Sequence, residues 1–173
     1  MHYPEVAGNR KIGVIPMLHK DYLLGILQSQ FKLDFYGIHG LPHWERVAER
    51  GEALSRLTGA NPKVVEYFAY LHDSKRQNDD HDPEHGLRAS RYCRSLYDDG
   101  VIDLTPTELD QLCNAVRLHN LRHVTGDITF QVCIDSDRLD IGRVGKMPSP
   151  ERLFTMPGKA MAMRLQAEVA LHE

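Results

Sequence analysis

The stretch that decides the fold is residues 61–73, NPKVVEYFAYLHD. Asn61 followed by Pro62 is typical of a helix start, because an asparagine side chain caps free backbone N–H groups and proline fits the first turn. Behind this start, core-type residues recur at positions i, i+3, i+4 and i+7 and end in a histidine: Val65, Phe68, Ala69 and His72. The sequence therefore predicts a helix whose buried side ends in a histidine, followed at once by Asp73.

Helix signals of the same kind recur on both sides of this stretch. Thr105-Pro106 with Glu108 forms a capping box, and the apolar stripe behind it ends in His119. Further helices are expected over residues 18–31, 43–57 and 159–171 and from about residues 83 and 128, with a loop containing one helical turn over residues 142–157. No run of alternating strand residues is present, so an all-α, single-domain helical bundle of about six to eight helices is predicted. We expect an irregular arm over residues 1–17 and the helical domain over residues 18–173.

Composition narrows the classes of function. The chain has 173 residues and a mass of 19.7 kDa, which suits one domain. A hydrophobic fraction of 42% and a charged fraction of 26% exclude wholesale disorder. The net charge of -3 and the pI of about 6.4 argue against a broad nucleic-acid surface. The three cysteines, Cys93, Cys113 and Cys133, have no CxxC spacing, which argues against a disulfide framework or a cysteine zinc site.

Targeting signals are not evident in the sequence. The first residues lack a basic segment followed by an apolar one, and the uncharged stretch over residues 22–30 is too short to span a bilayer. We therefore expect a cytoplasmic protein that does not bind membranes, and we leave a homo-oligomer open.

Ionisable residues occupy core-facing positions on three of the expected helices: His72, His119 and Asp137. Burying such groups without partners costs about 2–7 kcal/mol, so hydrogen-bond partners or a bound metal ion must offset this cost. Histidine with carboxylate is a ligand set suited to Mn, Fe, Mg, Ni or Zn. Helical phase selects Asp137 over Asp135, which lies about 200° away on the same helix and is expected on the opposite face.

An ordered set of four residues lies on consecutive expected helices: His43, His72, Asp73 and Asp137. Their contexts are HWERV from His43, YLHD ending at Asp73, and DSDRLD around Asp137. This arrangement, over residues 39–143, resembles the HD-domain superfamily of metal-dependent phosphohydrolases. The resemblance implies a bundle of packed helices in which these four residues hold one divalent metal ion. It also implies hydrolysis of a phosphoester, often of a nucleotide, so we expect a small phosphorylated substrate.

The resemblance also suggests catalytic roles for Asp73, His85 and His119. Asp73 would anchor the ion and orient the attacking water. His85 and His119 resemble, in their order, the two extra histidines of binuclear members of the superfamily, so a second ion is possible although one is expected. His85 could instead bind phosphate or carry a proton near neutral pH.

Cations near the motif are candidates for binding the substrate phosphate: Arg46, Lys75, Arg76, Arg138 and Arg143. The sequence departs from some single-metal nucleotidases of the superfamily, which carry a glutamate shortly after the HD pair. Here Ser74, Lys75 and Arg76 follow Asp73 instead. The acids that could take the role of general base are Asp79, Asp80, Asp82 and Glu84, and the sequence does not choose among them.

Other interpretations remain open at this level. The four motif residues could form a buried hydrogen-bonded network without metal. His85 could be a surface residue at a helix start, and His119 a core histidine bonded to a carbonyl group. Two other functions are an iron-dependent oxygenase, which would need six metal ligands, and a ligand-binding HD module without turnover.

Overall fold

A computed structural model describes residues 20–121 and 126–171. Within these ranges the chain forms seven α-helices and two short 3₁₀ helices, and no strand. They are α1 (Lys20–Gln30), α2 (Leu41–Thr58), α3 (Pro62–Leu71), α4 (His85–Asp98), α5 (Pro106–Leu118), α6 (Ile128–Arg138), η1 (Ile141–Val144), η2 (Pro150–Arg152) and α7 (Met156–Ala170). The predicted all-α class with about six to eight helices is confirmed. The arm expected over residues 1–17 lies outside the described residues.

Side-chain caps explain where several helices begin. At the start of α3, Asn61 accepts hydrogen bonds from the backbone N–H groups of Lys63 and Val64. The capping box expected at Thr105 and Glu108 is present at the start of α5. Two other pairs of a polar residue and proline do not open a long helix directly. Asp82-Pro83 lies just before α4, and Ser149-Pro150 lies at the start of the short η2.

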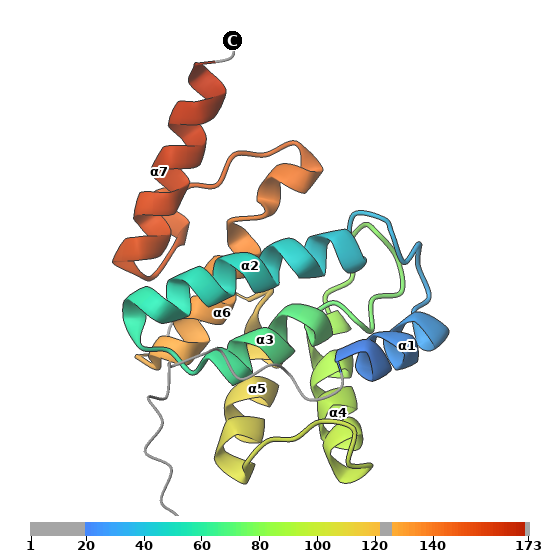
Figure 1. Ribbon diagram of the computed structural model, residues 1–173. Helices are drawn as coiled ribbons and strands as arrows, with labels where there is room; N and C mark the ends of the chain where they lie inside the picture. Colours follow the sequence, from blue (N-terminus) through green and yellow to red (C-terminus); the bar gives the residue numbers. More distant parts are fainter. Residues whose placement is uncertain (1–19, 122–125, 172–173) are drawn as a thin grey trace, which may run out of the picture.

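Helix α3 is the centre of the bundle. Seven of its residues are buried: Val64, Val65, Tyr67, Phe68, Ala69, Tyr70 and Leu71. Helices α2, α5 and α6 pack against it, and α4 runs beside α5 on the outside (Figure 1). Because His72 and Asp73 directly follow α3, the fold places both in the interior, where each is at most 3% exposed.

The beginning of α2 is fixed by a tight turn at Gly40. A Cβ atom there would lie 2.1 Å from the carbonyl oxygen of Phe35, so only glycine fits. Trp44 is fully buried in the next turn and packs edge-to-face against Phe31 and Phe35. This anchoring holds His43, in the first turn of α2, toward the centre of the molecule.

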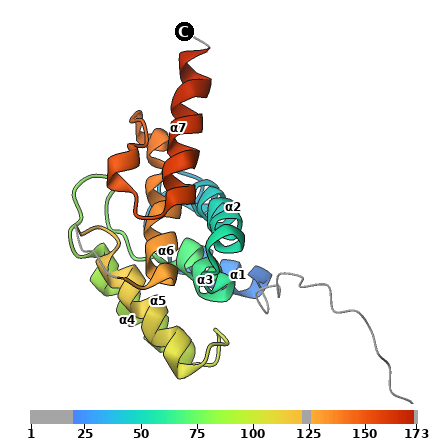
Figure 2. The same cartoon turned by 90° about the vertical axis from the view of Figure 1, so that its left-hand side faces the viewer.

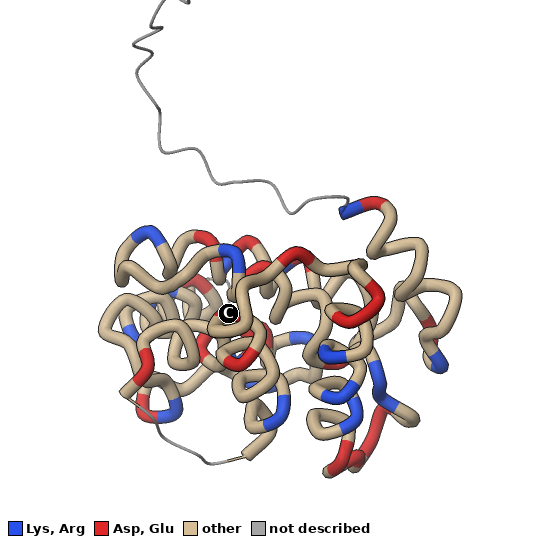
Figure 3. The backbone as a smooth tube through the Cα atoms, turned by 90° about the horizontal axis from the view of Figure 1, so that it is seen from below, with Lys and Arg blue, Asp and Glu red and all other residues tan. Residues whose placement is uncertain are grey.

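Helix α7 projects from one side of the bundle, and its first half packs on α2 and α6 (Figures 1 and 2). Its start is capped by Thr155, which accepts a hydrogen bond from the N–H of Gly158. Acidic and basic residues are interspersed along the described chain (Figure 3). In the described ranges, every helix is too short or too polar to cross a membrane.

Candidate metal centre

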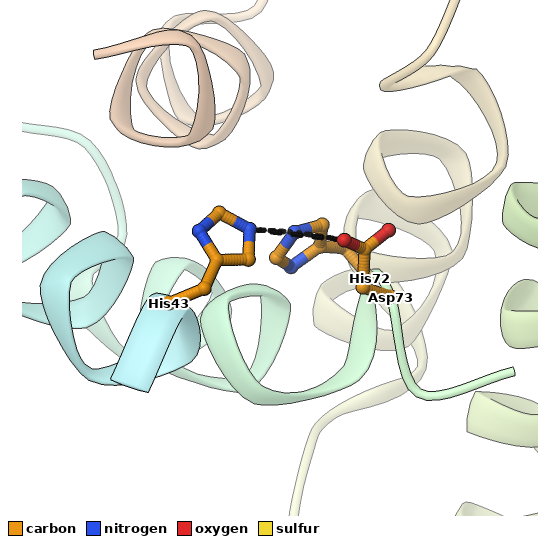
Figure 4. A group of neighbouring side chains, drawn as sticks. All are labelled: His43, His72 and Asp73. Carbon is orange, nitrogen blue, oxygen red and sulfur yellow. Dashed lines mark hydrogen bonds and ion pairs between the residues drawn. The ribbon is translucent and has the colours of Figure 1, made fainter. Parts of the chain in front are cut away.

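The four motif residues converge from three helices on one point in the interior. Figure 4 shows His43, from the first turn of α2, directed at His72 and Asp73, which follow α3. His43 Nε2 lies 3.1 Å from His72 Nε2. Oδ1 of Asp137, in the last turn of α6, lies 3.3 Å from His43 Nε2 and 3.6 Å from His72 Nε2. Asp73 Oδ2 completes the group at 3.8 and 3.7 Å from the same two nitrogens.

A second group of donors lies on the other side of Asp73. His85 Nε2 and His119 Nε2 are 2.9 Å apart, and they lie 3.2 and 3.6 Å from Asp73 Oδ1. The close approach of α4 to the end of α5 depends on Gly86, because a Cβ there would lie 2.8 Å from the carbonyl oxygen of Val116. Each oxygen of Asp73 therefore faces a different pair of histidines.

The other ring nitrogen, Nδ1, fixes the tautomer of these histidines. His72 Nδ1 lies 3.1 Å from the carbonyl oxygen of Phe68, and His119 Nδ1 lies 2.7 Å from that of Val116. His85 Nδ1 contacts the carbonyl oxygen of Asp82. A carbonyl oxygen only accepts hydrogen bonds, so each Nδ1 carries the proton and each Nε2 presents a lone pair.

His43 follows the same pattern with a carboxylate as partner. Its Nδ1 lies 2.8 Å from Oδ2 of Asp140, which is buried behind it. Metal-bound histidines in proteins show this arrangement, in which the second ring nitrogen donates to a carboxylate or a carbonyl group.

These geometries test whether the residues fit a metal ion. With Nδ1 protonated, the lone pairs of His43 and His72 face each other at 3.1 Å, and those of His85 and His119 at 2.9 Å. Oδ1 of Asp137 is buried and makes no hydrogen bond with a described residue. Lone pairs and an unpaired carboxylate oxygen that converge in a buried space repel one another unless a cation lies between them. The donor set fits a divalent cation.

The charges of the site agree with this interpretation. Burial on its own would raise the pKa of Asp73, but the surrounding imidazole rings of His72, His119, His39 and His85 hold it well below the usual value. Burial would also raise the pKa of Asp137, but the nearby rings of His43 and His72 hold it well below its usual value. Both carboxyl groups are therefore ionised, which is the form that binds metal.

Asp135 corrects one expectation about α6. We expected it on a face opposite to Asp137 and away from the core, whereas it is fully buried. Its carboxylate accepts hydrogen bonds from the N–H groups of Phe154 and Thr155 at 2.8 Å each and from Thr155 Oγ1 at 2.7 Å. The segment before α7 returns over this side of α6, so both faces of the helix are covered. Asp135 anchors α7, and Asp137 faces the histidines.

Two of the five predicted substrate-binding cations lie at the centre. Arg76 is buried, its Nε lies 3.7 Å from Asp73 Oδ1, and both Nε and Nη1 lack a hydrogen-bond partner among the described residues. Arg143 Nη2 lies 3.8 Å from Asp137 Oδ1, and its buried Nε is likewise without a partner there. These guanidinium groups carry unused donors beside the candidate metal ligands.

The other three cations have different surroundings. Arg46 donates two hydrogen bonds to Asp140. Lys75 turns to the ring of Tyr92, 3.7 Å from its centroid, and to Gln30. Arg138 lies over the ring of Phe154 and donates to the carbonyl oxygen of Arg152 at 2.5 Å. Their predicted contact with substrate stays a prediction.

Arg138 and His119 line the same cavity, which has a volume of about 900 Å³. Its wall combines cationic and apolar side chains: Arg138, Lys146 and Arg152 with Ile141, Met147, Leu153 and Phe154. A cavity of this size accommodates a ligand as large as a nucleotide.

Of the acids considered as general base, Asp82 accepts hydrogen bonds from residues outside the site. Arg88 Nη2 donates to both of its oxygens at 2.6 Å, and the N–H of Gln77 donates at 2.8 Å. The other three are exposed: Asp79, Asp80 and Glu84.

Two residues of the site were missed from sequence. His39 Nδ1 lies 3.1 Å from Asp73 Oδ2. Asp140 Oδ2 lies 2.8 Å from Nδ1 of His43, the ring nitrogen that does not face His72. The only available signal for Asp140 was its place in DSDRLD, three residues after Asp137.

Comparison with known proteins identifies the class. No family model and no curated protein matches the sequence. A crystal structure of a predicted HD superfamily hydrolase from an uncultured Thermotogales bacterium matches with a TM-score of 0.69 and 25% sequence identity, over 89% of this chain and 88% of that chain. The fold and the arrangement of the motif residues therefore define an HD-type helical domain. The resemblance to the HD-domain superfamily that the motif indicated is confirmed.

Proposed function

We propose that this protein is a metal-dependent phosphohydrolase that cleaves a phosphoester of a small phosphorylated molecule. The observation that carries the proposal is the convergence of four histidine Nε2 atoms and two carboxylates in a buried space. The structural neighbour, a predicted HD superfamily hydrolase, supports the hydrolytic class.

The first donor group would hold the ion: His43, His72, Asp73 and Asp137. When bound, a divalent ion polarises a phosphoryl oxygen and lowers the pKa of a coordinated water toward neutrality. Two of the four donors are imidazole nitrogens, which favours Mn, Fe, Ni or Zn over Mg, because Mg prefers oxygen ligands. Asp73 is positioned to orient the water, because its carboxylate lies between the two pairs of histidines.

Arg76 and Arg143 are the groups that we assign to the phosphate. Both lie beside the metal ligands and carry N–H donors without a partner in the described chain. A guanidinium group pairs with phosphate oxygens through two parallel hydrogen bonds, so it can hold the phosphate in line for attack. Phosphoryl transfer requires mainly such positioning and neutralisation of charge.

His85 and His119 give the site a second donor group around Asp73 Oδ1. The sequence predicted one ion, with a second possible. We propose that this second position is filled more weakly, since it has three donors against four in the first. When no ion occupies it, the Nε2 atoms of these histidines can accept and return a proton.

The cavity beside His119 would receive the organic part of the substrate. Its volume of about 900 Å³ and its mixture of Phe154 and Met147 with Lys146 and Arg152 suit a molecule with a flat apolar part and negative charge. A nucleotide is the substrate to test first.

A panel of phosphomonoesters, including nucleotides, tests the proposal. Protein supplied with Mn, Ni, Fe, Zn or Mg is expected to release phosphate from at least one substrate, and metal-depleted protein is not. The His72→Ala variant serves as the control for contaminating phosphatases. Absence of metal-dependent release across the panel would contradict the proposal.

An iron-dependent oxygenase is the second candidate, and one observation favours it. Six donors surround the centre, which is the ligand set that a pair of iron ions needs: His43, His72, Asp73, His85, His119 and Asp137. Two iron ions in the purified protein together with substrate-dependent oxygen consumption would favour this function over hydrolysis.

A further inference from the structure

Asp140 is a buried aspartate directly behind the candidate metal centre. Its Oδ2 faces His43 Nδ1 at 2.8 Å and Arg46 Nη2 at 3.0 Å. Its Oδ1 faces Arg46 Nε at 2.8 Å and Arg50 Nη1 at 2.5 Å. Each oxygen of this carboxylate thus receives two donors, and the side chain is only 4% exposed.

We propose that Asp140, clamped by Arg46 and Arg50, is a positioning residue that locks His43 in the tautomer able to bind metal. The inference rests on the metal site of the proposed function. A carboxylate accepts hydrogen bonds and does not donate them, so the contact at 2.8 Å requires the proton of His43 on Nδ1. The lone pair is then on Nε2, which faces His72 and Asp137.

His43 is the histidine on which this idea can be tested. The Nδ1 atoms of His72, His85 and His119 are bonded to backbone carbonyl groups, which a substitution does not remove. The tautomer of His43 depends on a side chain instead. Changing Asp140 therefore changes the tautomer of one ligand and leaves the other three as they are.

The Asp140→Asn substitution reverses the hydrogen bond. An amide has one oxygen and one NH₂ group. The Oδ1 position faces two guanidinium donors, from Arg46 and Arg50, whereas the Oδ2 position faces one, Arg46 Nη2, beside a histidine ring that can change its tautomer. The amide oxygen takes the Oδ1 position, so the NH₂ group takes the place of Oδ2 and faces His43 Nδ1. His43 must then accept with Nδ1 and carry its proton on Nε2, where it blocks metal binding.

Asp135→Asn provides a matched control. Asp135 is also a fully buried aspartate, on helix α6, and its partners are Phe154 and Thr155 at the start of α7. If burial of an aspartate were the only relevant property, both variants would lose stability alike and bind metal alike. The proposal separates them, because only Asp140 touches a metal-binding histidine.

The experiment titrates the metal-depleted full chain with Zn²⁺ by calorimetry. We expect Asp140→Asn to weaken Zn²⁺ binding by about 10–100-fold, as for other residues that hold a metal-bound histidine. Asp135→Asn is expected to lower the thermal midpoint and to keep the affinity of the wild type. Equal affinity of the wild type and Asp140→Asn overturns the role of Asp140. Failure of the wild type to bind Zn²⁺ overturns the metal site itself, so the two failures are distinguishable.

If Asp140→Asn does not fold, a measurement on the wild-type protein tests whether Asp140 sets the tautomer of His43. In the metal-depleted protein, at a pH where the His43 ring is neutral, ¹⁵N-resolved NMR of the imidazole rings is expected to show the proton of His43 on Nδ1. A His43 ring protonated on Nε2 would overturn the proposal. A merely structural role of Asp140 predicts no particular tautomer.

Discussion

Replacing Asp135 by alanine should lower the free energy of unfolding and leave the metal affinity unchanged. The substitution removes three hydrogen bonds, from the N–H groups of Phe154 and Thr155 at 2.8 Å and from Thr155 Oγ1 at 2.7 Å. A hydrogen bond to an ionised group contributes up to about 3 kcal/mol, but burial raises the pKa of Asp135, which shows that its charge is disfavoured there. We therefore use about 1 kcal/mol for each bond. The expected loss in free energy of unfolding is about 3 kcal/mol.

Urea unfolding and thermal scans of the metal-free protein measure this loss. For a chain of this size, about 3 kcal/mol corresponds to a decrease of about 6–12 °C in the midpoint. Both proteins are compared without metal, so that bound ions do not add to the stability of either. A loss below about 1 kcal/mol would refute the assigned anchoring role. A decrease in metal affinity would refute the separation of Asp135 from the site.

Three further predictions concern the metal ligands. His72→Ala should lose bound metal and phosphatase activity while keeping its helical circular dichroism, because the apolar packing of α3 supplies most of the folding energy; full activity in this variant would refute the site. His85→Ala should reduce the number of Mn²⁺ ions bound at saturation from two to one, and an unchanged number would exclude His85 as a ligand. Metal affinity should fall as the pH is lowered, since protons compete for the imidazole nitrogens. Burial lowers the pKa of His43, but its contacts with Asp137 and Asp140 raise it above the usual value, so this competition should begin above the usual range for an imidazole; calorimetric titrations at several pH values check this, and constant affinity between pH 7.5 and 5.5 would exclude histidine ligands.

The helices and the motif were predictable from the sequence because their signals are local. The caps at Asn61 and Thr105 determine where α3 and α5 begin, and helical spacing placed His72 and His119 toward the interior. Helical phase also distinguished Asp137 from Asp135. In the structure only Asp137 faces the histidines.

The surroundings of the site depend on contacts between distant segments, which helical periodicity does not encode. Asp135 is buried because the chain returns over α6 before α7 begins. Lys75 and Arg76 are neighbours in sequence, yet Lys75 turns to Tyr92 and Arg76 to Asp73. The link from Asp140 to His43 spans 97 positions. Nothing in the local sequence specifies these pairings.

The central claim is that two histidines and two aspartates hold a divalent ion, and anomalous diffraction from crystals of the Mn²⁺-loaded protein tests it most directly. We predict an anomalous peak within bonding distance of the Nε2 atoms of His43 and His72 and of carboxylate oxygens of Asp73 and Asp137. A peak elsewhere, or no peak in crystals grown with excess Mn²⁺, would contradict the claim.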